Sequence, residues 1–225
     1  MHDMIYRHEW KHEIARAEML ILRQRLCAVA QQDPHAVGGR YTIRSLYFDS
    51  PDDRALREKL DGVDRREKFR IRCYNGDLSV IHLEKKSRRN GLGSKQSAVL
   101  SIDQTRAIIN GDVGWMARSE EALVRELYEK MLVQGLRPKT IVEYTREPFV
   151  FAPGNVRVTL DYDIRTGLNC TDILAPDCVT VPAGNAVVLE VRWDEFLPDV
   201  IRNAVQLGHR RTGAFSKYAA CRMYG

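Results

Sequence analysis

Polar and apolar residues alternate along much of this chain with a period of two, which is typical of β-strands that have one buried face. In the clearest stretch, Lys68, Arg70 and Arg72 fall on one side of an extended segment, and Phe69 and Ile71 fall on the other. Asn75-Gly76 follows and predicts a tight hairpin, because both residues tolerate positive φ. Similar patterns predict strands over residues 6–14, 41–50, 66–74, 78–88, 139–151, 155–164 and 186–194.

Other segments carry apolar residues at helical spacing. The first predicted helix covers 17–32 and ends before Asp33-Pro34. A helix over 119–135 is expected to begin at Ser119, with Glu120 and Glu121 in its first turn, and to end at Gly135. Shorter helices are predicted over 54–62, 101–112 and 195–208, and residues 214–225 form a short tail.

The charged faces of the predicted strands indicate one shared surface. One such strand would be an ordinary solvent-facing strand, but the same alternation recurs on at least four others. These faces carry Arg7, Glu9 and Lys11; Tyr144 and Arg146; Arg157, Thr159 and Asp161; and Glu190 and Arg192. We therefore expect an α+β domain in which an antiparallel sheet closes into a barrel, with the charged faces inside and the helices packed outside. A positive interior with a few carboxylates suits a polyanion and a metal ion.

Composition limits the protein class. The 225 residues are expected to form a single domain spanning 1–225, with an apolar fraction of 44% and a net charge of +5. No apolar run resembles a membrane span or a signal peptide, and five cysteines without CxxC spacing are typical of reduced thiols in a cytoplasmic protein. The basic residues lack aromatic neighbours on the same face, so nucleic-acid binding is not expected.

Several motifs, in order along the chain, resemble a known family. They are YRHEWKHEI, RSLYFDS, REKFRIRCY, HLEKKSR, TIVEYTREPF, VRVTLDYDIR, VVLEVRW and AFSKYAA, and together they span Tyr6 to Tyr218. In this order they resemble the VTC domain, the polyphosphate-polymerase module of the vacuolar transporter chaperone complex, which belongs to the triphosphate tunnel metalloenzyme superfamily and has bacterial relatives. Two positions depart from the expected pattern: Arg192 stands where many relatives have lysine, and Gln96 or Ser97 stands where a basic residue is expected.

The resemblance implies an eight-stranded antiparallel tunnel in which the γ-phosphoryl of ATP is transferred to inorganic polyphosphate. It implies Mn²⁺ or Mg²⁺ as the cofactor, held by Glu190 and secondarily by Glu9, and it allows a membrane-protein partner outside this chain. Arg70, Arg72 and Lys217 are implied as catalytic residues. The implied triphosphate-binding residues are Lys11, Arg70, Arg72, Lys86, Lys95, Arg146, Arg157 and Lys217. Lys68 is expected near the tunnel mouth, and Lys85 and Arg88 are expected in solvent.

Alternatives stay open at this stage. A tripolyphosphatase or nucleoside triphosphatase would use nearly the same residues, and a tunnel closed at one end would favour it. A non-catalytic polyphosphate sensor is a third possibility. Glu190 could instead serve only in a salt bridge to Arg192, and Ser216-Lys217-Tyr218 could be a surface tail.

Overall fold

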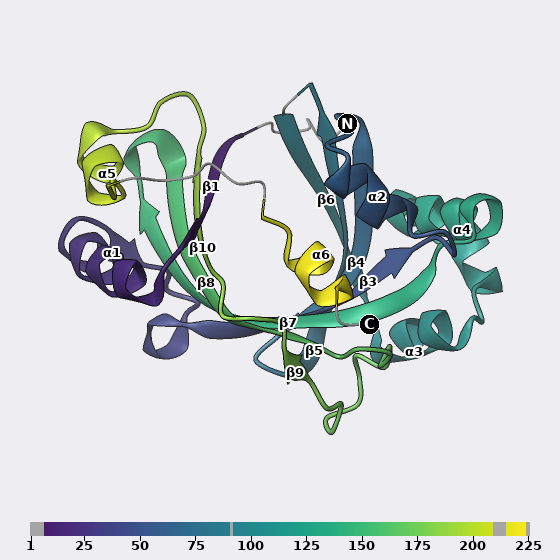
Figure 1. Cartoon of the computed structure of the whole chain (residues 1–225). Helices are drawn as coiled ribbons and strands as arrows, with labels where there is room; N and C mark the ends of the chain where they lie inside the picture. Colours follow the sequence, from purple (N-terminus) through teal and green to yellow (C-terminus); the bar gives the residue numbers. More distant parts are fainter. Residues whose placement is uncertain (1–6, 91, 209–214, 224–225) are drawn as a thin grey trace.

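A strongly curled antiparallel sheet dominates the computed structural model, which describes residues 7–90, 92–208 and 215–223 (Figure 1). Eight strands are hydrogen-bonded in the order β1-β10-β8-β7-β3-β4-β5-β6, and the short strands β2 (Gln31–Gln32) and β9 (Val181–Pro182) pair with β7 and β8. The bounds of the main strands are β1 His8–Ile14, β3 Tyr41–Asp49, β4 Arg66–Tyr74, β5 Asp77–Arg89, β6 Leu92–Leu100, β7 Arg137–Phe151, β8 Val156–Thr166 and β10 Val187–Trp193.

The two end strands of this order, β1 and β6, come together at one end of the curl. Arg7 and Gly93 form an isolated antiparallel bridge, and the Lys86 ammonium lies 3.1 Å from a Glu9 carboxylate oxygen. The predicted α+β fold with an eight-stranded antiparallel sheet is therefore confirmed, in the form of a curled sheet whose edges meet locally.

Helices cover the outer face of the sheet in two places (Figure 1). On β8 and β10, α1 and α5 enclose a core that includes Leu22, Leu189 and Ile201. On β4, β5 and β6, α3 and α4 enclose a second core that includes Ile71 and Leu127. The helices are α1 Arg16–Val29, α2 Arg54–Leu60, α3 Ile102–Asn110, α4 Ala122–Gln134, α5 Asp199–Ala204 and α6 Lys217–Arg222, with 3₁₀ turns at Val37–Gly39, Gly114–Arg118 and Pro153–Asn155. Because the apolar strand faces pack outward, the charged faces line the concave side, as the alternation predicts.

The last helix, α6, lies on the concave side of the sheet (Figure 1). Its Ser216 cap accepts a hydrogen bond from the Ala219 amide, and its buried Tyr218 stacks on Tyr47 of β3. The Tyr218 hydroxyl donates a 2.6 Å hydrogen bond to Asp49. The expectation of a short tail at 214–225 is thus wrong where the structure describes it, since 217–222 is helical and held inside the curl.

Other element boundaries differ from the predictions for local reasons. The first helix ends at Val29 rather than Gln32, because Gln31 and Gln32 pair with β7. Helix α4 begins at Ala122, and Ser119 instead ends the preceding 3₁₀ turn. The final predicted helix shrinks to α5, which Pro198 precedes. No helix within the described ranges is long and apolar enough to cross a bilayer.

The Asn75-Gly76 hairpin forms as predicted. The φ angles of Asn75 and Gly76 are 53° and 70°, which is the left-handed pair that a two-residue turn requires. Tyr74 consequently pairs with Asp77, but the pairing of β4 and β5 then shifts at an irregularity between Tyr74 and Arg72, beyond which the two strands keep the register in which Arg72 lies opposite His82. All the charged rows described next depend on that register.

Candidate functional site

Cross-strand register gathers the cations of β4 and β5 into rows on the concave face. Arg70 lies opposite Glu84, and Lys68 lies opposite Lys86. On the other side of β5, Lys86 lies opposite Lys95 of β6. The stretch that first suggested a charged face therefore forms one wall of the curl.

Glu84 ties the cations of this wall together. Its carboxylate lies 2.6 Å from the Arg70 guanidinium, 3.0 Å from the Lys95 ammonium and 3.6 Å from the Arg72 guanidinium, and the residue is only 2% exposed. Burial by itself would raise the pKa of Glu84, but the positive charges of Arg70, Arg72 and Lys95 outweigh it and hold that pKa well below its usual range. Glu84 is therefore a permanent anion inside a cluster of cations.

A pair of carboxylates lies on the neighbouring strands β1 and β10. The Glu190 carboxylate contacts the Lys11 ammonium at 2.8 Å and the Arg192 guanidinium at 2.7 Å. Glu9 contacts the same two cations, at 3.6 Å and 2.9 Å, and Lys86 from β5 at 3.1 Å. Despite burial and mutual repulsion, these cations lower the pKa of Glu9 to about 2 and hold that of Glu190 well below its ordinary value. Both carboxylates are ionised at any working pH.

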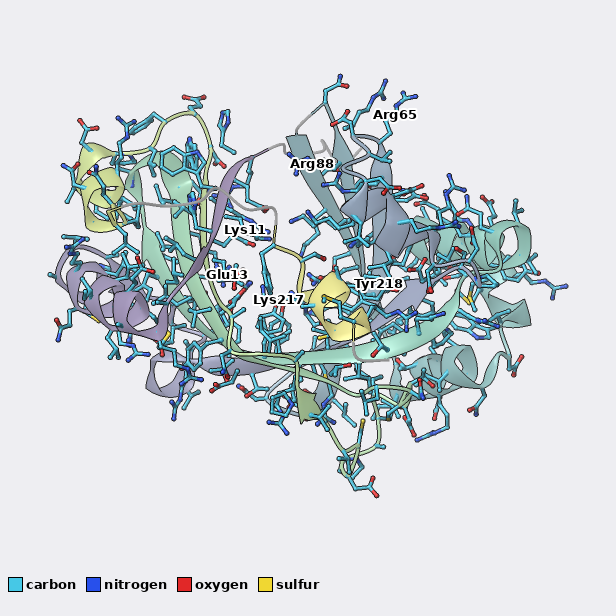
Figure 2. All side chains as sticks on the ribbon, viewed as in Figure 1. Lys11, Glu13, Arg65, Arg88, Lys217 and Tyr218 are labelled. Atoms are coloured by element: carbon cyan, nitrogen blue, oxygen red, sulfur yellow. The ribbon has the colours of Figure 1, made fainter. Side chains whose placement is uncertain are left out.

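The third cluster joins the floor of the curl to α6. Asp161 of β8 is fully buried and accepts two hydrogen bonds from the Arg146 guanidinium, at 2.6 and 2.7 Å. Lys217 of α6 reaches the same carboxylate at 2.6 Å and lies over the Tyr144 ring. Burial would raise the pKa of Asp161, but Arg146 and Lys217 lower it. Figure 2 shows Lys11 and Lys217 approaching the interior of the curl from β1 and α6.

Arg157 and a set of tyrosines complete the lining. Arg157 lies 2.8 Å from the Asp33 carboxylate and donates to the Tyr41 hydroxyl at 2.9 Å. Arg70 donates to the Tyr47 hydroxyl at 2.9 Å, and Arg72 to the Tyr144 hydroxyl at 3.3 Å. The tyrosine rings support the guanidinium groups from the sheet floor.

The structure thus brings together all ten sequence-predicted site residues. With Arg192 added, nine cations share five carboxylates, which leaves four positive charges in excess. The five carboxylates are Glu9, Asp33, Glu84, Asp161 and Glu190.

Sequence reasoning gave no site role to Asp33, Glu84, Asp161 or the tyrosines. Glu84 and Asp161 alternate with cations on their strands, so that pattern is the signal that identifies them. Asp33 comes from a connecting segment and has no such signal. Lys85, which was expected in solvent, instead packs on the outer face, where it pairs with Glu67 at 3.2 Å and with Glu126.

Glu9 and Glu190 fit a divalent metal that is also bound by phosphate. Both are ionised, and both contact Lys11 and Arg192, so they lie side by side. Among the described residues, no group of three or more His, Cys, Asp or Glu side chains could enclose a metal. Two carboxylates, with phosphate oxygens and water as the remaining ligands, is the arrangement typical of Mg²⁺ in phosphate-handling sites.

Comparisons with known proteins agree with this geometry. The family model of the VTC domain matches residues 6–224. A crystal structure of a candidate adenylate cyclase from Bacillus halodurans has a TM-score of 0.52 and 12% identity, over 84% of this chain and 80% of that one. A candidate adenylyl cyclase from Hippeastrum, reported to have a dominant triphosphatase activity, has a TM-score of 0.58 and 14% identity, over 97% of this chain and 96% of that one. No curated protein sequence matches the chain. At these identities the solved structures show a shared fold, and the match over nearly the whole sequence shows that the chain belongs to the VTC domain family.

Proposed function

We propose that this chain is a metal-dependent phosphotransferase that transfers the γ-phosphoryl group of ATP to a growing inorganic polyphosphate chain. The observation that carries the proposal is the convergence of nine cations, four in excess of their carboxylates, on one concave face beside Glu9 and Glu190. A bound triphosphate carries about four negative charges, which would neutralise that excess.

The proposed catalytic groups act by positioning and charge neutralisation. Arg70 and Arg72 present planar guanidinium forks that grip phosphate oxygens bidentately, and Lys217 supplies a compact positive charge from the opposite side. Phosphoryl transfer needs little covalent help from the protein, so these donors stabilise the charge on the transferred group. Glu190 and Glu9 are the residues that would hold a divalent metal ion, which would add to the neutralisation of phosphate charge.

Ligand binding exchanges internal ion pairs for phosphate contacts. In the ligand-free protein, Glu84 and Asp161 each bind several of the cations that a phosphate would bind. These carboxylates keep the side chains oriented toward the interior before substrate arrives. The arrangement is therefore a preorganised site in which carboxylates take the place of phosphates.

A hydrolase on the same scaffold is the second candidate function. Helix α6 lies on the concave side of the sheet and contacts its floor, so it would restrict passage of a polymer at that end. The Hippeastrum relative of similar fold is reported to be dominantly a triphosphatase. In a hydrolase, water replaces the growing chain as the phosphoryl acceptor.

Product analysis separates the functions. The purified chain is incubated with ATP and either Mn²⁺ or Mg²⁺, and long-chain polyphosphate is then separated from free phosphate. Long chains support the polymerase and free phosphate alone supports the hydrolase. Tight triphosphate binding with neither product indicates a non-catalytic sensor.

Variants test the site assignment itself. Glu190→Gln should abolish turnover while triphosphate binding is largely retained, because the metal carboxylate is lost and the cations remain. Glu143→Gln is a matched control, since Glu143 forms an ion pair with Arg44 at 2.7 Å on the outer face. A fully active Glu190→Gln enzyme would refute the metal assignment. We further propose that 1–225 is one domain that acts in the cytoplasm, with or without a membrane-protein partner.

A further inference from the structure

Three cations at one end of the β4–β5 wall, together with Lys59 of helix α2, differ from the nine described above. Lys59, Arg66, Lys68 and Arg88 form no ion pair with a carboxylate anywhere in the described parts of the chain, whereas every cation of the inner site has at least one such partner. Asp64 and Glu58 act on Arg66 only at longer range. This end of the wall is therefore positive and uncompensated.

Strand register forces these cations together. Arg66 lies directly opposite Arg88, and Lys68 lies directly opposite Lys86, in the part of the β4–β5 ladder that lies beyond the register shift. Like charges directly opposite each other in an antiparallel pair destabilise the sheet. Two adjacent like-charge rows are consequently a cost to the ligand-free fold, and an anion placed between them would remove that cost.

Neighbouring elements increase the repulsion. Lys59 belongs to α2. Burial lowers the pKa of Lys59 most, and the positive charges of Arg66 and Arg88 lower it further. The Lys68 ammonium lies 5.0 Å from the centre of the Tyr218 ring of α6. Burial, followed by the positive charge of Lys59, lowers the pKa of Lys68 to about 7. The negative charge of Asp49 opposes this shift only in part.

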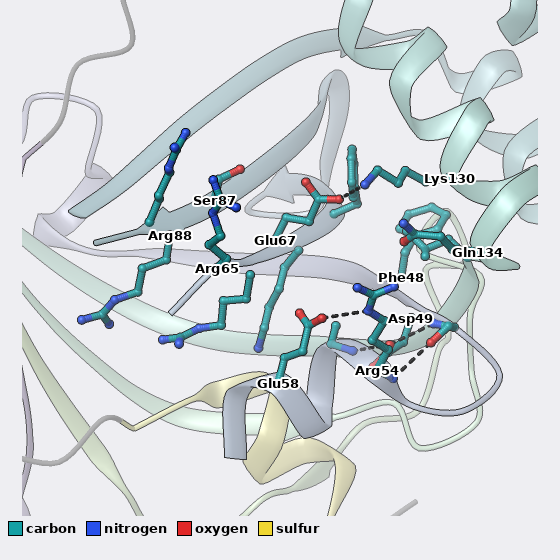
Figure 3. A pocket seen from close by; sticks show the side chains of 17 residues that line it. Phe48, Asp49, Arg54, Glu58, Arg65, Glu67, Ser87, Arg88, Lys130 and Gln134 are labelled. Atoms are coloured by element: carbon teal, nitrogen blue, oxygen red, sulfur yellow. Dashed lines mark hydrogen bonds and ion pairs between the residues drawn. The ribbon is translucent and has the colours of Figure 1, made fainter. Parts of the chain in front are cut away.

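A cavity of about 320 Å³ opens beside these residues (Figure 3). Arg66, Lys68 and Arg88 belong to its lining, together with Arg54 and Glu58, which pair with each other at 2.8 Å. Figure 2 places Arg88 at the rim of the curl, away from Lys11 and Lys217. The uncompensated cations thus lie between the inner site and open solvent.

We propose that Lys59, Arg66, Lys68 and Arg88 form a second anion site, a mouth site that binds the part of a polyphosphate chain extending beyond the inner triphosphate site. This inference rests on the proposed function. The rows Arg70–Glu84, Lys68–Lys86 and Arg66–Arg88 follow one another along the strands at steps of roughly 7 Å, because alternate residues share a face. Only a linear anion longer than a triphosphate can occupy the inner rows and the mouth site together.

Binding of two chain lengths tests the mouth site. Isothermal titration calorimetry of the full chain uses inorganic tripolyphosphate and a long-chain polyphosphate of narrow length distribution. In the double variant Lys59→Gln/Arg88→Gln, the dissociation constant for tripolyphosphate should change less than about twofold, while that for the long chain should rise about tenfold or more.

A charge-matched control is available on the outer helices. Arg106 and Arg202 lie on α3 and α5, each in an exposed i,i+3 ion pair, so Arg106→Gln/Arg202→Gln removes the same two charges away from the site. This control should leave both dissociation constants unchanged. An equal loss of affinity for both ligands in the mouth variant would show only a long-range field and would overturn the mouth site, as would an unchanged long-chain affinity.

The two proposals fail in different ways. If the native protein forms no product from ATP but still prefers the long chain through Lys59 and Arg88, the proposed function fails and the mouth site stands as a binding site. If product forms and the double variant keeps its long-chain affinity, only the mouth site is wrong.

Discussion

Glu84→Gln is the most informative single change, because the Glu84 carboxylate forms ion pairs with three cations of the inner site at once. The substitution keeps the shape of the side chain and removes its charge. Arg70, Arg72 and Lys95 then lose their shared carboxylate, and all three face one another without compensation. We expect the ligand-free protein to become less stable and the affinity for tripolyphosphate to increase.

The size of the stability loss follows from burial. Glu84 is 2% exposed, and removal of one partner from a buried ion pair typically costs about 3–5 kcal/mol. Because Lys95 is exposed and Arg70 retains its 2.9 Å hydrogen bond to Tyr47, we take the lower end, about 3 kcal/mol. For a domain of this size that loss lowers the melting temperature by roughly 6–12 °C. The pKa of Glu84 is held far below neutral, so the loss should be the same at pH 6 and pH 8.

Thermal unfolding at low salt, with and without inorganic tripolyphosphate, measures both effects. The variant should regain most of the lost melting temperature at saturating ligand, because phosphate oxygens replace the missing carboxylate. Glu143→Gln serves again as the control, because it is the same isosteric change and breaks an ion pair on the outer face. This variant should be less stable, and tripolyphosphate should raise its melting temperature no more than it raises that of the native protein.

The reasoning fails if Glu84→Gln binds tripolyphosphate more weakly than the native protein. That result would mean that Glu84 assists binding more by orienting Arg70 and Lys95 than it opposes binding by competing with the ligand for them. A native-like melting temperature would refute the other half of the argument, since it would mean that the three cations relax into solvent without cost.

Three further results are expected. Long-chain polyphosphate should bind native protein most tightly below about pH 7, where Lys68 and Lys86 are both protonated, and more weakly up to pH 9; Lys68→Arg should flatten part of that calorimetric profile, and equal profiles would refute the role of Lys68. Asp161→Asn should lower the free energy of unfolding in urea by about 3–5 kcal/mol, because Arg146 loses its partner in a buried pair; a loss below 1 kcal/mol would contradict this. Tyr218→Phe should cost about 1.5–3 kcal/mol through its bond to Asp49 and speed hydrogen exchange in α6, and unchanged exchange would show that this bond does not hold the helix.

The fold was predictable from the sequence because its information is local. Alternation gives seven of the eight main strands, all except β6, and it also identifies which face is apolar. Phe69 and Ile71 therefore predict an outer core, and Arg70 predicts the concave face. The Asn75-Gly76 turn predicts the hairpin itself, but the register of the charged rows also depends on an irregularity between Tyr74 and Arg72 that the turn does not encode. What alternation cannot give is the docking of α6, since Lys217 and Tyr218 make their contacts with residues 56 and 169 positions earlier.

The inner site was predictable for its cations and less so for its carboxylates. Each cation belongs to a strand face that the pattern marks, whereas Asp33 lies in a turn and reaches Arg157 only through the tertiary fold. Pairing across strands is also invisible to a single-strand pattern. Arg88 is solvent-exposed, as predicted, but its position opposite Arg66 follows only from the register of the ladder.

The inner cations are paired with carboxylates and the mouth cations are not, so the two parts of the tunnel should bind phosphate differently. In the inner site every phosphate contact must replace a carboxylate contact, so binding there is an exchange whose net energy is modest even when the individual interactions are strong. At the mouth no carboxylate has to be displaced, and an arriving anion relieves repulsion between Arg66, Arg88 and Lys59. A phosphate chain should therefore be attracted first to the mouth and gain selectivity further in, where only an anion able to replace Glu84 and Asp161 is accepted. The residues that determine the affinity for a long chain would then differ from those that select the reacting triphosphate. Substitutions could therefore change one property without the other.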